Sequence, residues 1–185
     1  MEKLGKWKRL QSKMVVDHKF CKVRRDEIEL PNGKIIDDFF VHIKPDIAYI
    51  LAITTNKEII FVRQYRYAID DFFLELPAGG FDPATESAEV AAMRELKEET
   101  GYIAPGLKKL ATLYDRPSGD TNRTHLFLAE NAVKVGEQNL DETEEIEVVL
   151  IPQEEVLNKI YQGEICVKGS VAALFLGLNL SGKLL

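Results

Sequence analysis

The segment Gly79–Tyr102 constrains the fold of this chain more than any other part of its sequence. It reads GGFDPATESAEVAAMRELKEETGY and predicts a helix that begins near Thr85 and ends at Gly101. Thr85 is a good N-cap residue, and Glu86 and Glu89 suit the positive end of the helix dipole. Glycine is the usual residue just past a helix C-terminus. The segment therefore predicts one well-bounded amphipathic helix.

Acidic side chains crowd the last turns of this expected helix. Glu95 and Glu99 lie one turn apart on the same face with Glu98 beside them, and like charges at this spacing weaken a helix. Arg94 lies four residues before Glu98 and can form an ion pair with it. Two carboxylates then remain on one face, which suits a hard divalent cation such as Mg²⁺. A solvated charged face is the alternative that the helix alone leaves open.

Apolar runs separated by turn signals predict β-strands on both sides of the helix. Asn32-Gly33 is a strong turn signal between the alternating runs 19–30 and 34–43, which together predict a β-hairpin. A second strand pair is expected over 48–67, around a turn at 55–57. Further strands are expected over 72–81, ending in a Pro/Gly loop, and over 108–115, 124–133 and 146–152, with helices over 153–163 and 170–180. The buried stripe of the first helix is expected to hold Val90, Met93 and Leu96, helped by Ala92.

The order of these elements predicts the fold class. Strands outnumber helices and do not alternate strictly with them, so a mixed sheet with helices on both faces fits better than a doubly wound parallel sheet. We therefore expect an α+β fold, and 185 residues make one main domain the default. That domain is expected over 46–185. A small N-terminal β-hairpin region over 1–45 is expected to pack beside it or to contact another subunit.

Composition excludes several classes of function. The formal net charge of -6 argues against nucleic acid as the main partner, because phosphate backbones attract basic patches. No apolar run reaches the roughly 18–20 residues of a membrane span. The basic N-terminal segment lacks the apolar centre of a signal peptide, so we expect a cytoplasmic protein. Cys21 and Cys166 are far apart and are expected to be buried small side chains, not a disulfide or zinc pair.

The spacing of the residues around the acidic helix matches a known signature. From Gly80, five residues lead to Glu86 and seven more lead to Arg94, which opens the run RELKEETGY. This resembles the signature of the Nudix hydrolase family, G-x5-E-x7-R-E-U-x-E-E-x-G-U, in which U is a bulky apolar residue. All seven fixed positions match, and Tyr102 occupies the last U position, where an aliphatic residue is commoner. The resemblance implies the Nudix fold, an α/β/α sandwich around a mixed sheet.

The resemblance also implies an activity and a metal site. Members of the family hydrolyse a nucleoside diphosphate linked to another group, X, with Mg²⁺ or Mn²⁺. By this resemblance Glu95 and Glu99 are metal ligands, and Glu98, paired with Arg94, is an accessory ligand or a positioning acid. A backbone carbonyl just before the signature is also a ligand. The loop AGGFDPATE is one residue longer than the common form, so this carbonyl belongs to Ala78 or Gly79.

Residues outside the signature resemble the ADP-ribose pyrophosphatase subgroup. The likeness lies in VRQYR, ELPAG, the late acidic segment LDETEEIEVVLIP, and Pro117, sixteen residues after Gly101. It implies that Arg66 contacts a substrate phosphate or the terminal ribose, and that Glu75 contacts the ribose side. It also implies that Glu142 is the general base and Glu144 an additional metal contact, although the two roles could be exchanged.

One loop departs from this subgroup, and it lies where the X group should be recognised. The subgroup commonly shows S-P-G followed by a glutamate, whereas here Arg116 and Ser118 flank Pro117 and Asn122 stands at the acidic position. Arg123 adds a positive charge, and it and Pro117 are expected to contact substrate. Three functions stay open: hydrolysis of ADP-ribose, hydrolysis of GDP-mannose or another nucleotide sugar, and nucleotide sensing without turnover. The subgroup usually forms dimers, which implies a homodimer.

Overall fold

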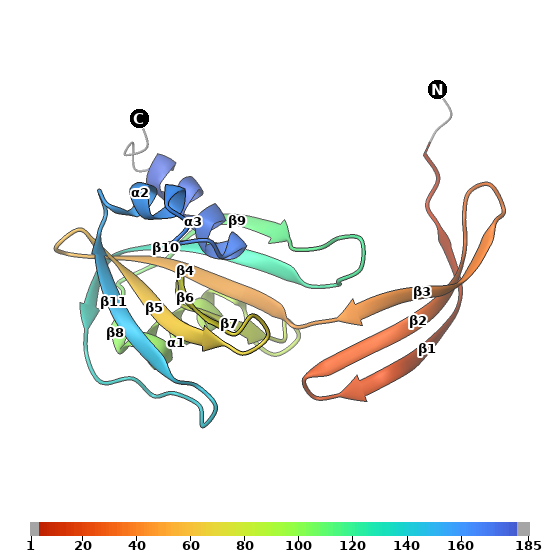
Figure 1. The fold of residues 1–185 in the computed structure, drawn as a ribbon, viewed down its shortest axis with the longest axis horizontal. Helices are drawn as coiled ribbons and strands as arrows, with labels where there is room; N and C mark the ends of the chain where they lie inside the picture. Colours follow the sequence, from red (N-terminus) through yellow and green to blue (C-terminus); the bar gives the residue numbers. More distant parts are fainter. Residues whose placement is uncertain (1–3, 181–185) are drawn as a thin grey trace. The chain divides into compact units, whose positions relative to one another are not determined.

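A computed structural model of the chain describes residues 4–180, and Figure 1 shows its fold. The chain divides into two compact units. The first holds the described residues up to Pro45 together with Tyr114–Arg123. The second holds Asp46–Leu113 and the described residues from Thr124 onward. Each unit has its own β-sheet, as set out below.

The first unit is built on an antiparallel sheet with strand order β1-β2-β3. The strands are β1 (Lys8–His18), β2 (Cys21–Glu29) and β3 (Ile35–Ile43). The expected hairpin is present as β2 and β3, and Gly33 in its turn has a φ of +82°, which favours glycine. Strand β1 was not predicted. All of its residues are exposed, so its sequence lacks the alternation that marks a half-buried strand.

The segment Tyr114–Arg123 is attached to the end of β3 within this unit. The backbone N–H of His42 donates a hydrogen bond to the carbonyl oxygen of Gly119 at 2.8 Å. The Asp120 carboxylate accepts from Lys44 Nζ at 2.7 Å and from Arg116 Nε at 3.0 Å. These two cations, Lys44 first, lower the pKa of Asp120 to about 2. The loop that departs from the ADP-ribose pattern is therefore held by charge as well as by backbone bonds.

The second unit contains a mixed sheet with the order β11-β5-β4-β10-β8, to which β6 adds on β5, β7 on β4 and β9 on β10. Strand β10 runs parallel to β4, whereas β5 and β7 pair antiparallel with β4. The mixed sheet that the sequence predicts is thus confirmed. The strands are β4 (Asp46–Thr54), β5 (Glu58–Arg66), β6 (Asp71–Glu75), β7 (Ala78–Phe81), β8 (Tyr102–Ile103), β9 (Lys108–Tyr114), β10 (Arg123–Lys134) and β11 (Ile146–Pro152).

Helices cover both faces of this sheet (Figure 1). Helix α1 (Ala88–Thr100) covers one face, and α2 (Val156–Tyr161) and α3 (Lys168–Leu180) cover the other. Neighbouring residues of β4 divide between the two layers, because Ile50 packs in the cluster with α1 and Leu51 in the cluster with α3. This alternation is the period of a strand that is buried on both faces. The expected α/β/α sandwich is confirmed.

Strands β7 and β8 were not among the predicted elements. The glycines of β7 suggest a loop, yet the segment pairs antiparallel with β4, with Gly79 opposite Ala48 and Ala78 opposite Tyr49. Tertiary pairing therefore overrides the weak strand propensity of glycine. Because of this pairing, the backbone around Ala78 and Gly79 is a fixed part of the sheet.

Helix α1 begins two residues later than the sequence predicts. Its N-cap is Ser87, whose side-chain oxygen accepts from Val90 N at 3.3 Å, whereas Thr85 lies in the preceding turn. The C-terminal prediction is confirmed, since Gly101 has a φ of +74° and its N–H donates to Lys97 O. Val90 is 58% exposed, so its expected burial is wrong. The buried residues of α1 are Ala88, Ala91, Ala92, Glu95, Leu96, Glu99 and Thr100.

Cys21 and Cys166 are both exposed free thiols, so their expected burial is wrong.

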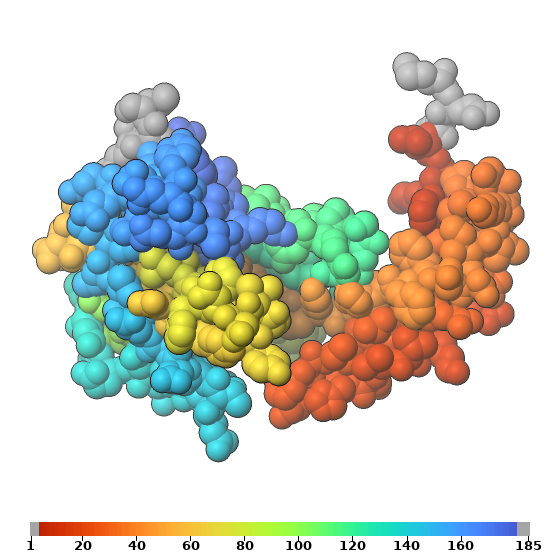
Figure 2. All heavy atoms as spheres, in the orientation of Figure 1, coloured from red at the N-terminus to blue at the C-terminus, as the bar shows by residue number. Residues whose placement is uncertain are grey.

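Exposed apolar residues mark the turn between β5 and β6, the yellow segment on the surface in Figure 2. There Tyr67 is 87% exposed and Ile69 is 66% exposed. Within residues 4–180, helices are too short or too polar to span a membrane.

Candidate active site

Helix α1 places two acidic side chains against the backbone of β7. Glu95 and Glu99 are only 8% and 5% exposed, although both carry carboxylates. The Glu99 Oε2 atom accepts a hydrogen bond from Ala78 N at 3.0 Å. The Glu95 carboxylate fills the space beside Gly79, so a Cβ atom at this position would force that carboxylate to move. The residues predicted as metal ligands on α1 and β7 are thus brought together.

Arg94 binds three acidic side chains around the same face of α1. Its Nη1 atom donates to Glu95 Oε1 at 2.6 Å and to Glu98 Oε2 at 3.0 Å. Its Nε and Nη2 atoms donate to the two oxygens of Glu86 at 3.0 and 3.1 Å. The hydrogen bonds to Glu86 are the main cause that raises the pKa of Arg94, and Arg94 in turn lowers the pKa of Glu86. The Arg94–Glu98 pair predicted from the spacing is present.

The two buried carboxylates of the site have raised pKa values. Burial raises the pKa of Glu99 to about 8, and the negative charge of Glu95 contributes to the same shift. Burial also raises the pKa of Glu95, against the opposing effect of Arg94. The charge of Glu144 acts in the same direction on both groups. A divalent cation would relieve this accumulation of negative charge.

The donor atoms around Glu95 and Glu99 can be matched to a metal ion. In the part of the chain that the structure describes, no three His, Cys, Asp or Glu side chains converge as they would around one ion. Glu98 and Glu95 are instead turned toward Arg94. Two carboxylates one turn apart and the adjacent backbone of β7 nevertheless offer only oxygen ligands. Mg²⁺ prefers such ligands and completes its shell with water, so the residues fit this ion.

Arg66 and Glu75, both predicted to contact substrate, bind each other. Arg66 Nε donates to Glu75 Oε1 at 2.6 Å, and Arg66 Nη2 donates to Glu75 Oε2 at 2.9 Å. The pKa of Arg66 is raised mainly by this bond, with a smaller contribution from Glu99. Glu75 is buried, whereas 46% of the Arg66 side chain is exposed. Glu75 therefore orients a guanidinium group that lies within electrostatic range of Glu99 and is still accessible.

The acidic loop after β10 presents one of its two candidate carboxylates to α1. Glu144 is half-buried, its N–H donates to Asp141 O at 2.9 Å, and its Oε2 atom accepts from Asp141 N at 3.0 Å. Its charge acts on Glu95 and Glu99, as described above. Glu142 is exposed in the turn of the loop. Of the two carboxylates, Glu144 is therefore the one whose charge acts on Glu95 and Glu99, and the roles of Glu142 and Glu144 stay predictions.

Gln138 connects this loop to the helix, a contact that was not predicted. Its Nε2 atom donates to the carbonyl oxygen of Glu99 at 2.6 Å and to that of Ile146 at 3.0 Å. The neighbouring Asn139 N–H donates to Glu98 O at 2.8 Å. A glutamine in a polar loop shows no periodicity from which such a contact could be predicted. Only the tertiary structure identifies it.

Pro117 and Arg123 belong to the first unit, in the segment attached to β3. Within that segment Asn122 Nδ2 donates to Asp115 Oδ2 at 3.2 Å. Asn122 is 2% exposed, so the residue at the expected acidic position is a buried part of the loop. Substrate contacts by Pro117 and Arg123 stay predictions.

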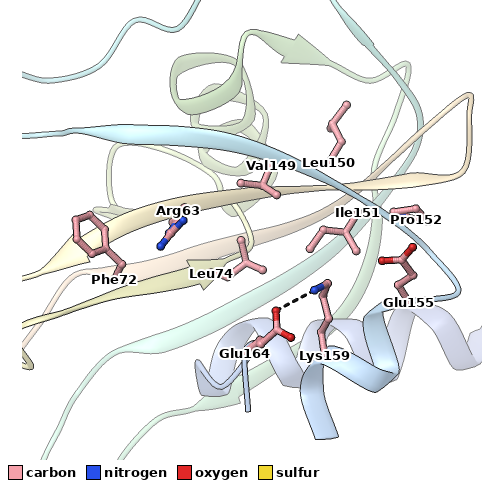
Figure 3. A pocket seen from close by; sticks show the side chains of 10 residues that line it. All are labelled: Arg63, Phe72, Leu74, Val149, Leu150, Ile151, Pro152, Glu155, Lys159 and Glu164. Atoms are coloured by element: carbon pink, nitrogen blue, oxygen red, sulfur yellow. Dashed lines mark hydrogen bonds and ion pairs between the residues drawn. The ribbon is translucent and has the colours of Figure 1, made fainter. Parts of the chain in front are cut away.

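A separate cavity of about 520 Å³ lies on the α2/α3 face of the sheet (Figure 3). It is lined by Arg63 and Phe72 at one end and by the Lys159–Glu164 ion pair, with an N–O distance of 2.8 Å, at the other. Its lining includes none of the predicted site residues. The acidic site and this cavity are therefore distinct features of the second unit.

Comparison with known proteins places both parts of the chain in described families. Residues 44–167 match the NUDIX domain, and residues 7–42 match the nucleoside diphosphate sugar hydrolase N-terminal domain. A crystal structure of an ADP compounds hydrolase matches with a TM-score of 0.86 at 25% sequence identity, over 100% of both chains.

Relatives of known name are similar over most of the chain. An ADP-ribose pyrophosphatase of Bacillus subtilis is 36% identical over 76% of this chain and 75% of its own length. A methanol dehydrogenase activator of Bacillus methanolicus is 30% identical over 94% of each chain. A GDP-mannose pyrophosphatase of Cronobacter sakazakii is 37% identical over 60% of this chain and 61% of its own length. With the signature, the fold and these matches together, the chain belongs to the Nudix family.

Proposed function

We propose that this protein hydrolyses the pyrophosphate bond of a nucleotide sugar, with ADP-ribose as the first candidate and Mg²⁺ as the metal. Water attacks one phosphorus atom, the bond from that atom to the bridging oxygen breaks, and the products are a nucleoside monophosphate and a sugar phosphate. The observation that carries the proposal is the pair of buried carboxylates, Glu95 and Glu99, against the backbone of β7. Nucleotide diphosphates are bound in this way through a metal ion.

The residues of the site divide the work of this reaction. Glu95 and Glu99 would hold the ion, together with the carbonyl of Ala78 or Gly79. When bound, Mg²⁺ neutralises the diphosphate and polarises its oxygens, and Mn²⁺ can replace it. Glu144 accepts the proton of the attacking water. Arg66, oriented by Glu75, binds a substrate phosphate or the terminal ribose, since a fixed guanidinium suits such oxygens.

Arg94 contributes by holding Glu98 and Glu86 at fixed positions beside the ligands. A charged side chain near the ion would otherwise sample several rotamers, which weakens an aligned metal site. Glu98 is the most exposed acid in this group, with 37% of its side chain accessible. It can therefore take up a further ligand position without breaking the packing of α1.

The X group determines which nucleotide sugar is the substrate. ADP-ribose is supported by the names of the Bacillus subtilis relative and of the ADP compounds hydrolase. GDP-mannose is the second candidate, supported by the Cronobacter sakazakii relative. A nucleotide-sensing role without turnover would not require the intact set of Glu95, Glu98 and Glu99. The net charge of -6 continues to argue against nucleic acid as a partner.

A turnover screen with Mg²⁺ tests the proposal. ADP-ribose, GDP-mannose, UDP-glucose, NADH, diadenosine polyphosphates and nucleoside triphosphates are each incubated with the protein, and released phosphate esters are separated by chromatography. The Glu95→Gln variant, purified in parallel, reports contaminating hydrolases. We expect turnover of at least one nucleotide sugar by the wild type only. Binding without turnover across the series would establish the sensing role instead.

We also propose that the protein is a homodimer through its first unit. This unit exposes Trp7 (54%) just before β1, Phe20 (82%) in the turn between β1 and β2, and Phe40 (51%) in β3. Aromatic residues are enriched at protein interfaces. Light scattering after size exclusion should give twice the 20.9 kDa mass of one chain. A monomeric mass at micromolar concentration would refute the dimer.

A further inference from the structure

We propose that Gln138 is a positioning residue for catalysis, one that holds the acidic loop so that Glu144 faces the carboxylates of α1. This inference rests on the proposed function, because it gives Glu144 a role in the reaction. It concerns a residue that lies outside the family signature and carries no ionisable group.

The side-chain amide of Gln138 bridges two backbone carbonyls that come from different elements. One belongs to Glu99 in the last turn of α1, at 2.6 Å from Nε2, and the other to Ile146, the first residue of β11, at 3.0 Å. A carbonyl at a helix C-terminus has no partner within the helix. Gln138 therefore supplies a donor to the free carbonyl of Glu99, a predicted metal ligand. It also supplies a donor to the carbonyl of Ile146 at the start of β11.

These two bonds close the acidic loop at its base. The loop leaves β10 and returns at Ile146, so the bond from Gln138 to Ile146 O joins its two ends. The bond to Glu99 O and the backbone bond from Asn139 N to Glu98 O, at 2.8 Å, fix this base to α1. A loop that is closed at its base has fewer accessible conformations. Its internal hydrogen bonds then determine which of these conformations it adopts.

The internal bonds of the loop transmit this position to Glu144. Glu144 lies two residues before Ile146, and it exchanges two hydrogen bonds with Asp141 at 2.9 and 3.0 Å. The carboxylate is thus held between the closed base and the turn. Because the amide that bonds Ile146 O also bonds Glu99 O, Glu144 lies two residues from a point that is fixed to the last turn of α1. Glu142, at the exposed turn, is not held in this way.

The NH₂ group of Gln138 supplies the donors of both bonds. Leucine at position 138 keeps most of the volume but leaves two carbonyls without a donor, and glutamate keeps the shape but replaces the NH₂ group by an oxygen. Gln138→Leu and Gln138→Glu are therefore the informative variants. Gln162→Leu is the matched control, because Gln162 is an exposed glutamine at the end of α2.

The first test measures the loop itself and needs no turnover. Amide hydrogen exchange is followed by NMR for Asn139 and Glu144, whose N–H groups bond within the loop and to α1. We expect Gln138→Leu to accelerate exchange at both amides by about tenfold or more, because local opening becomes easier. Gln162→Leu should leave both rates unchanged. Unchanged rates in Gln138→Leu would overturn the inference, whether or not the protein turns over any substrate.

The second test is a double-mutant cycle on kcat with the substrate that the screen identifies. Gln138→Leu alone should lower kcat by about tenfold and change KM by less than about threefold, since it displaces a group used in the transition state. In a Glu144→Gln background the same substitution should have almost no effect. Independent, multiplying effects would show that Gln138 does not act through Glu144. A normal kcat for Glu144→Gln would instead refute the proposed base, while the exchange result still decides the closure.

Discussion

The two faces of the sheet in the second unit are built from different side chains. On the α1 face, eight of the thirteen residues in the buried core are alanines, whereas on the α2/α3 face only one of thirteen is. The α2/α3 face is filled by leucine, isoleucine, valine and phenylalanine. The buried carboxylates Glu95 and Glu99 lie on α1. The face with the smaller apolar side chains is thus the one that carries the buried carboxylates Glu95 and Glu99.

This difference explains how short acidic side chains reach a strand backbone. Alanines on the helix, such as Ala91 and Ala92, and on the sheet, such as Ala48, allow α1 to lie close to it. At that distance Glu99 can contact Ala78, and Glu95 can fill the space beside Gly79. Alanine buries less apolar area than leucine, at roughly 25 cal/mol per Å². The α2/α3 face therefore contributes more of the stability, and the α1 face carries the candidate active site.

The largest effect is expected from a change on the α1 face. Glu99→Gln removes one charge from the metal site while keeping the shape of the side chain, so kcat should fall by about 10²–10³-fold, since a metal supplies several kcal/mol of transition-state stabilisation. The fold should be retained because a buried repulsion is removed. The measurement is kcat with Mg²⁺, with circular dichroism for the fold, and Glu89→Gln as an exposed control on the same helix. Turnover within threefold of the wild type would remove Glu99 from the metal site.

The opposite result is expected on the other face. Leu174→Ala in α3 creates a cavity at a fully buried position and should lower the free energy of unfolding by about 2–5 kcal/mol. Its kcat per folded molecule should match that of the wild type. Urea denaturation and active-site-normalised kinetics make the measurement, with the exposed Leu176→Ala as the control. A parallel loss of kcat would mean that the two faces are not functionally separate.

The same contrast limits what the sequence could predict. The acidic face was predictable because residues four positions apart lie on the same face of a helix. The Arg94–Glu98 pair follows from the same rule. The Arg66–Glu75 pair was not, because it depends on the pairing of β5 with β6, and strand register has no such rule. The acidic loop has no period, so its residues could not be ordered by role.

Local competition explains the remaining differences in the fold. Thr85 and Ser87 are both good N-cap residues, and the turn around Asp82, whose carbonyl accepts from Thr85 N at 3.0 Å, decides between them. This turn lies outside the helix, so the N-cap preferences of Thr85 and Ser87 do not predict which of them begins it. Strand β1 carries no buried face that a pattern could mark. Sequence patterns thus predicted the elements with long apolar runs and missed β1, which is exposed, and the short strands β7 and β8.

A smaller effect should appear in the pH dependence of stability without metal. The pKa of Glu99 is raised to about 8 in the folded protein from an ordinary value of 4.5. Between these values the folded state holds a proton that the unfolded state has released, so stability falls as pH rises from about 4.5 to 8. The slope is at most about 1.4 kcal/mol per pH unit for one such group. Urea denaturation in EDTA at several pH values measures it.

Glu99→Gln provides the control for this slope, because glutamine cannot titrate. The variant should lose most of the fall in stability between pH 5 and 8, whereas Leu174→Ala should keep it at a lower overall stability. Such a pair of results would place the titrating group on the α1 face. A slope that is the same in the wild type and in Glu99→Gln would assign it to other groups.

The smallest effect concerns the two sides of α1 itself. Val90 is 58% exposed on the side away from the sheet, whereas Leu96 is fully buried. Val90→Ala exchanges a β-branched residue for the best helix former and should raise the free energy of unfolding by about 0.5 kcal/mol. Leu96→Ala should lower it by about 2–5 kcal/mol, because it opens a cavity beside the alanines. Urea denaturation measures both variants. Changes of opposite sign would show that α1 contributes stability only through the side that also carries its carboxylates. A loss of stability in Val90→Ala comparable to that in Leu96→Ala would show that the other side of the helix is covered as well.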